Sequence, residues 1–93
     1  MTRDEFFNIV EKENLIDRMD YDVSLSQNLP LGCFTYGCVY DNGKWRVCLT
    51  NERRTPSFIK DFNNESDALE FFLEELREEA ALTDAKRSII EEI

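Results

Sequence analysis

The stretch CFTYGCVYDNGKWRVCLT, residues 33–50, decides the fold that this sequence predicts. At its centre, Asp41-Asn42-Gly43-Lys44 is typical of a β-hairpin, because Asn and Gly tolerate the positive φ angles of a two-residue type I′ turn. The cross-strand pairs are then Asp41 with Lys44, Tyr40 with Trp45, Cys38 with Val47 and Tyr36 with Leu49.

Side chains alternate between the two faces of a strand, so this register divides the hairpin into an apolar face and a mixed face. The apolar face carries Phe34, Tyr36, Cys38, Tyr40, Trp45, Val47 and Leu49. The mixed face carries Thr35, Gly37, Val39, Arg46, Cys48 and Thr50. A glycine weakens a strand, so Gly37 indicates either a bulge or twist or the close approach of a partner.

A strand is predicted on each side of the hairpin. Residues 21–26 alternate apolar and polar side chains before a loop at 27–32, and residues 56–62 alternate again after a polar link at 51–55. This alternation adds further side chains to the apolar face: Tyr21, Val23, Leu25, Phe58 and Phe62. Because the connections are short, we expect a four-stranded antiparallel meander.

A first helix is predicted before the strands. Thr2 and Glu5 form a capping-box pattern ahead of apolar residues at helical spacing, which predicts a helix over residues 3–14. Phe6 and Phe7 are neighbours and cannot both face the core equally, so one of them is expected to be peripheral.

A longer amphipathic helix is predicted after the last strand, with Asn64 or Ser66 as its cap. Its apolar residues recur every three or four positions: Ala68, Leu69, Phe72, Leu73, Leu76 and Ala80. The stripe then shifts to Leu82, Ala85, Ile89 and Ile93. Thr83 either caps a separate helix over 82–93 or lies within one continuous helix. Residues 1–93 are thus expected to form one α+β domain, with the C-terminal helix packed on one sheet face.

The charge of the chain excludes several classes of function. Its 93 residues include 20 acidic and 11 basic side chains and no histidine, giving a net charge of −9. Such a chain is not expected to bind nucleic acid. Without histidine it lacks the commonest general base and metal ligand, so we expect no enzymatic activity and no cofactor. With no leader and no membrane-length apolar segment, a cytoplasmic location is expected.

The three cysteines are Cys33, Cys38 and Cys48. Their spacing matches no zinc motif, and no disulfide is expected in a chain with an odd number of cysteines and no secretion signal. We therefore expect buried or half-buried thiols.

The acidity is concentrated in the predicted helices. Residues 1–20 have a net charge of −3, residues 21–64 of +1 and residues 65–93 of −7. Two surfaces are candidates for binding a partner. One is the outer face of the last helix, with Glu70, Glu74, Glu75, Glu78 and Glu79; the other is the mixed sheet face with the following link, with Thr35, Gly37, Arg46, Arg53 and Arg54. Ordinary solvated surfaces have similar compositions.

The pattern over about residues 20–77 resembles the small cytoplasmic immunity proteins encoded beside bacterial polymorphic toxins, including contact-dependent and LXG-type systems. The similar features are the YDVSLS strand, the Gly-aromatic strand, the Asn-Gly turn into Trp45, the T-x-E-R step at 50–53 and the helix that follows Phe62 and an acidic cap. Arg54 and Thr55 depart from a more glycine-rich step, and no binding residue is carried over. The resemblance implies a non-enzymatic inhibitor of a cognate toxin.

An acidic inhibitor suits a basic toxin such as a nuclease, because complementary charge speeds association. The alternative is an acidic nucleic-acid mimic, or a phage-type inhibitor, that binds a DNA-binding protein. Either a monomer or a homodimer is compatible with the sequence, because the late apolar stripe can pack on the first helix or on another chain.

Overall fold

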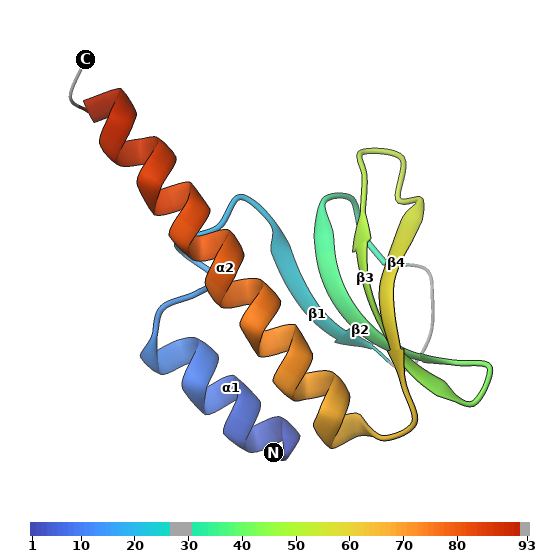
Figure 1. Ribbon diagram of the computed structural model, residues 1–93. Helices are drawn as coiled ribbons and strands as arrows, with labels where there is room; N and C mark the ends of the chain where they lie inside the picture. Colours follow the sequence, from blue (N-terminus) through green and yellow to red (C-terminus); the bar gives the residue numbers. More distant parts are fainter. Residues whose placement is uncertain (27–30, 92–93) are drawn as a thin grey trace.

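The computed structural model describes the backbone of residues 1–26 and 31–91 and the side chains of residues 1–25 and 31–87. The elements are α1 (Arg3–Lys12), β1 (Asp22–Ser26), β2 (Thr35–Asp41), β3 (Lys44–Thr50), β4 (Pro56–Phe62) and α2 (Glu65–Glu91). The four strands form one sheet, α2 crosses one of its faces, and α1 lies beside α2 (Figure 1). The predicted α+β class and order of elements are confirmed.

The central hairpin forms with the predicted register. β2 and β3 pair antiparallel, with Asp41 opposite Lys44, Tyr40 opposite Trp45, Cys38 opposite Val47 and Tyr36 opposite Leu49. Asn42 and Gly43 have φ angles of 53° and 77°, as a type I′ turn requires.

The predicted antiparallel meander is wrong for β1. β1 runs parallel to β2, from Asp22 opposite Thr35 to Ser26 opposite Val39, so the sheet is mixed. A parallel partner requires the chain to return to the end of the sheet where β1 began. Before β2 begins, Leu31 is buried with Val39 and Cys48 in a separate apolar cluster. The predicted loop at 27–32 lies partly outside the described residues.

A β-bulge places Phe58 on the opposite sheet face from the predicted one. β3 pairs antiparallel with β4, but Val47 lies opposite Lys60 while Cys48 lies opposite Phe58, so Ile59 is the extra residue. An extra residue reverses the alternation on one side of it. Phe58 therefore shares the face of Cys48, away from α2, whereas Phe62 stays on the helix-covered face opposite Trp45.

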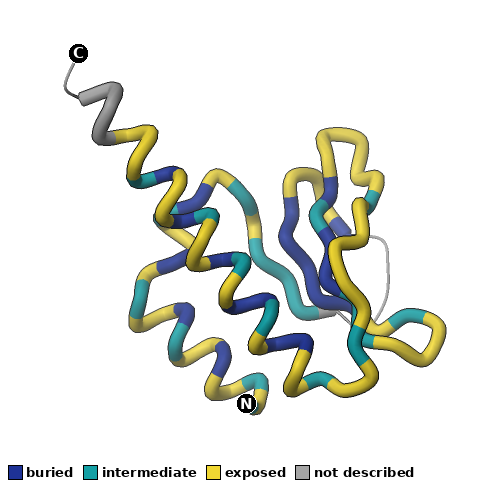
Figure 2. The backbone as a smooth tube through the Cα atoms, viewed as in Figure 1, coloured by how far each residue is buried: buried dark blue, intermediate teal, exposed yellow. Residues whose placement is uncertain are grey.

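The main core lies between the sheet and the helices. All six apolar positions predicted for α2 up to residue 80 are buried: Ala68, Leu69, Phe72, Leu73, Leu76 and Ala80. They pack with Tyr36, Cys38 and Val47 of the sheet and with Phe6 and Val10 of α1. The rings of Phe6 and Phe72 stack with centroids 5.3 Å apart. Figure 2 shows the buried positions of α2 on the side facing α1 and the sheet.

Both helices begin at side-chain caps. Thr2 Oγ1 accepts a hydrogen bond from Glu5 N at 3.2 Å, and Asn64 Oδ1 accepts one from Asp67 N at 2.8 Å, so Asn64 caps α2. α1 ends at Lys12, two residues earlier than predicted, and Asn14 at φ 55° reverses the chain.

The two helices run side by side in the same direction. Ion pairs join Arg3 to Glu65, Glu13 to Arg77 and Arg18 to Asp84. The partners advance in step from Arg3 to Arg18 and from Glu65 to Asp84, as the parallel course of α1 and α2 in Figure 1 requires. They fix the register of the first helical segment on the second.

α2 continues as one helix through Thr83 to Glu91, so the described chain contains no separate helix over 82–91. At 27 residues it is about 40 Å long, whereas the seven-residue strands are about 23 Å long, and its C-terminal part projects beyond the sheet. Leu82 is 56% exposed and Ala85 is also exposed, so these two residues do not pack on α1. Ile89 and Ile93 lie outside the described side chains.

Candidate interaction surfaces

The five predicted glutamates form one surface on α2, here called the acidic ridge (Glu70, Glu74, Glu75, Glu78 and Glu79). They lie within about 14 Å along the helix axis, since each residue rises about 1.5 Å. Glu70, Glu74 and Glu78 are exposed, and Glu75 and Glu79 are half-buried. At about 100° per residue, Glu70, Glu74 and Glu78 share the exposed face, while Glu75 and Glu79 lie further round the helix, so the ridge is a continuous band and not a single face.

Glu75 and Glu79 lie nearest the sheet. Burial raises the pKa of the Tyr36 hydroxyl to about 12, and the negative charges of Glu79 and Glu75 add to this increase. Partial burial also raises the pKa of the Glu75 carboxyl, followed by repulsion from Glu78, Glu79 and Glu74. The carboxylates of the ridge therefore repel one another and disfavour ionisation of Tyr36 in the sheet.

The two side-chain cations beside the ridge make their closest contacts with other groups. Arg77 lies within its span, but its guanidinium turns to α1 and donates two hydrogen bonds to Glu13, from Nε at 2.9 Å and from Nη2 at 2.5 Å. Lys60 of β4 lies over the rings of Phe62 and Phe71, with Nζ 5.3 Å from each centroid, and lines one hollow with Glu70 and Glu74 without forming an ion pair with either.

Among the described side chains, no cation lies within 4.0 Å of Glu74, Glu75, Glu78 or Glu79. Glu70 has the amine of Met1 at 3.9 Å. Four of the five ridge carboxylates therefore form no ion pair within the described part of the chain.

The second predicted set lies on the opposite side of the sheet and is not an open polar face. Thr35 is buried and donates a hydrogen bond to Cys33 O. Gly37 is covered by Leu31: a Cβ at Gly37 would lie 2.3 Å from Leu31 Cδ1. The sequence predicted either a bulge at Gly37 or the close approach of a partner. The residue that approaches Gly37 is Leu31 of the same chain, and the bulge lies in β4.

Arg46 is neutralised on this face. Its Nε donates to Asp61 Oδ1 at 2.9 Å and its Nη1 to Asp41 Oδ2 at 3.2 Å, and these hydrogen bonds raise the pKa of its guanidinium. The guanidinium carbon also lies 3.6 Å from the ring centroid of Phe58. Arg46 thus covers an aromatic ring and has no free charge for a partner.

Arg53 and Arg54 are exposed in the link between β3 and β4. Asn51 organises this link: its Oδ1 accepts hydrogen bonds from Arg53 N at 2.9 Å and Thr55 N at 3.0 Å. Arg54 has a φ of 63°, and no carboxylate in the described part of the chain lies within 4.0 Å of either guanidinium. The link projects from the end of the sheet, away from the start of α2 (Figure 1).

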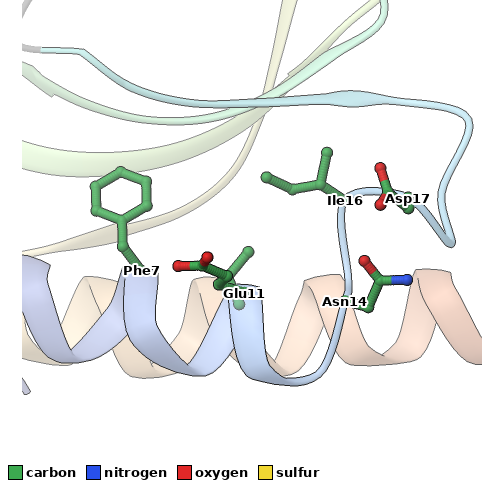
Figure 3. Close-up of a pocket in the computed structure, with 6 residues that line it drawn as sticks. Phe7, Glu11, Asn14, Ile16 and Asp17 are labelled. Carbon is green, nitrogen blue, oxygen red and sulfur yellow. The ribbon is translucent and has the colours of Figure 1, made fainter.

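A pocket on α1 was not predicted from the sequence. This α1 pocket has a volume of about 340 Å³ and is lined by Phe7, Val10, Glu11, Asn14, Ile16 and Asp17. Figure 3 shows Phe7 projecting from α1 and Ile16 from the turn that follows, on the same side. The one available signal was the Phe6-Phe7 pair, of which Phe7 is indeed the peripheral ring, 44% exposed.

The cysteines lie apart from these surfaces. Cys38 faces α2, Cys48 lies on the opposite sheet face, and burial raises the pKa of the Cys38 thiol to about 12 and that of Cys48 in the same direction. Cys33 is exposed, contrary to expectation, because β2 begins two residues later. No group of three His, Cys, Asp or Glu side chains suited to a metal ion occurs in the described chain.

Comparison with known proteins adds no assignment to this geometry. The chain matches no known family, no curated protein and no solved structure. Within the described residues, neither helix is long and apolar enough to cross a membrane.

Proposed function

We propose that this protein is an immunity protein that binds a basic bacterial toxin in the cytoplasm and neutralises it, with the acidic ridge as its contact surface. The observation that carries the proposal is the set of clustered glutamates whose nearest arginine, Arg77, is turned to α1. The resemblance of residues 20–77 to toxin immunity proteins supports the same function.

The charge of the ridge differs from the other charge of the molecule. Outside the ridge, five acidic side chains form ion pairs with arginines: Glu13, Glu65 and Asp84 bridge α1 and its following turn to α2, while Asp41 and Asp61 bind Arg46. Residues 65–93 contain ten acidic and three basic side chains. Most of the excess negative charge therefore lies in this segment, which favours electrostatic attraction of a partner to it.

Like charges on one helix face destabilise the free protein by about 0.2–0.5 kcal/mol for each pair spaced three or four residues apart. A cationic partner relieves this repulsion when it binds, so the free energy lost in the free protein is recovered in the complex. Long-range attraction also raises the association rate, which an inhibitor needs when its target is toxic to the cell.

A nucleic-acid mimic is the second candidate, and the straight row of Glu70, Glu74 and Glu78 favours it. These carboxylates repeat about every 6 Å along the axis. A duplex, however, presents two phosphate strands across a groove, and the ridge lies on one side of one helix. The geometry therefore favours a basic protein surface over a duplex-binding cleft.

The proposal is tested by co-expressing the chain with the toxin encoded next to its own gene. We expect restored growth and co-purification of the two proteins. The double variant Glu74→Gln/Glu78→Gln should lose protection. Glu52→Gln/Asp22→Asn, which removes the same charge from exposed sites outside the ridge, should retain it. Failure of the unmodified chain to protect or to form a complex refutes the proposal.

A further inference from the structure

The α1 pocket combines an apolar floor with an acidic rim. Phe7 and Ile16 are 44% and 45% exposed, and Val10 is buried beneath them. Glu11 and Asp17 supply the carboxylates. A volume of about 340 Å³ falls within the ~300–1,000 Å³ typical of ligand pockets.

The pocket is held by the fold and not by chance side-chain positions. Asn14, with φ 55°, reverses the chain after α1, and Leu15 N then donates a hydrogen bond to Val10 O at 3.1 Å. Leu15 is thereby turned into the core, where it is fully buried, and Ile16 is directed outward beside Phe7 (Figure 3). Preorganisation of this kind lowers the entropy lost on binding.

The same turn is also fixed to α2. Arg18 donates to Asp84 Oδ2 from Nη2 at 2.6 Å and to Glu13 O from Nη1 at 3.3 Å. These bonds occupy the guanidinium nearest in sequence to Asp17. Among the described residues, no cation lies within 4.0 Å of Glu11 or Asp17. The rim therefore remains anionic.

We infer that the α1 pocket binds a bulky apolar side chain of a protein partner that has a lysine or arginine directly beside it. The apolar floor accepts the side chain, and Glu11 and Asp17 bind the adjacent cation. A second copy of this chain is a poor occupant, because each copy has a net charge of −9 and the same acidic rim. In naming a protein partner, the inference rests on the proposed function and adds a second contact to the acidic ridge.

The inference is tested with a probe of the same chemistry, phenethylammonium, in an NMR titration that follows the backbone amides. Saturable shifts are expected at residues 7–17. The uncharged 2-phenylethanol should bind about fivefold more weakly at low salt, because it lacks the attraction to nearby carboxylates, and 3-phenylpropionate more weakly still. The double variant Glu11→Gln/Asp17→Asn should bind phenethylammonium and 2-phenylethanol with equal affinity.

Phe7→Ala and Ile16→Ala should each abolish these shifts. Leu82→Ala, at an exposed apolar position on α2, is the matched control and should leave them unchanged. The inference is overturned if residues 7–17 show no saturable shift, or if the wild-type chain binds ammonium and alcohol equally.

Because this titration needs no toxin, it fails or succeeds independently of the protection assay. With the toxin in hand, Phe7→Ala should weaken the complex at least about tenfold, as loss of a buried aromatic anchor does. A toxin complex that Phe7→Ala leaves unchanged would overturn the inference and leave the proposed role of the ridge standing.

Discussion

Replacing Glu75 by glutamine should stabilise the free protein at neutral pH. Partial burial and repulsion from Glu78, Glu79 and Glu74 raise the pKa of this carboxyl above its usual value of 4.5 in the folded state. The folded chain therefore binds the proton more tightly than the unfolded chain. Stability is gained as the pH falls through the raised pKa, and the charged form destabilises the fold above it.

The size of the effect follows from the neighbours of Glu75. Glu78 and Glu79 stand three and four residues further along the helix, and each such like-charge pair costs about 0.2–0.5 kcal/mol. Glu75→Gln should therefore raise the free energy of unfolding by about 0.5–1 kcal/mol at pH 7 and low salt. For a chain of this length, that corresponds to a rise in Tm of about 2–8 °C.

Urea and thermal unfolding at pH 7 and pH 4 measure this difference directly. As the pH falls through the raised pKa, the wild-type carboxyl takes up its proton, so the gain should be smaller at pH 4 than at pH 7, and high salt should reduce it at pH 7. Glu52→Gln, at an exposed site in the β3–β4 link, should change stability little at either pH. A Glu75→Gln protein no more stable than wild type at pH 7 would refute the reasoning that the ridge is electrostatically strained.

Three further predictions concern the fold. Phe72→Ala should lower the free energy of unfolding, measured in urea, by about 3–5 kcal/mol, because the ring of Phe72 is fully buried. Phe7→Ala should lower it far less, because Phe7 is 44% exposed. Equal losses would contradict the assigned faces of the helices. Gly37→Ala should destabilise by about 1–3 kcal/mol, since its methyl group meets the side chain that lies over it, and an unchanged midpoint would argue against that contact. The hydrogen bond from Arg77 lowers the pKa of the Glu13 carboxyl below its usual value of 4.5. Glu13→Gln should therefore be less stable than wild type above pH 4.5, and this difference should vanish as the pH falls through the lowered pKa. A difference in stability that stays constant from about pH 7 to about pH 2 would count against the ion pair.

The hairpin and α2 were predictable because their signals are local. Asn42-Gly43 selects one turn type and fixes the register of both strands. The apolar spacing of residues 68–80 selects one helix face, and the same period places the glutamates of the acidic ridge on the other side. No tertiary contact is needed for either inference.

The direction of β1 and the face of Phe58 depend on distant contacts. β1 is parallel to β2, and the buried Leu31 that precedes β2 has no periodic signal in the sequence. The alternation of residues 56–62 reads the same with or without a bulge at Ile59, so it could not show that Phe58 changes face.

The candidate sites were predictable to different extents. The glutamates of the ridge were identified, but their lack of ion pairs depends on Arg77 reaching Glu13 at the end of α1. The α1 pocket was missed because the exposure of Ile16 follows from the reversal at Asn14, which the sequence pattern did not reveal. Pairing between helices and irregular turns are the features that a one-dimensional pattern does not encode.

The central claim is that the acidic ridge binds a basic toxin, and isothermal titration of purified chain into the toxin encoded beside its gene tests it most directly. We predict a one-to-one complex that weakens as salt rises, and an affinity at least about tenfold lower for Glu74→Gln/Glu78→Gln than for Glu52→Gln/Asp22→Asn. Equal affinities for the two double variants, or no binding by the wild-type chain, would contradict the claim.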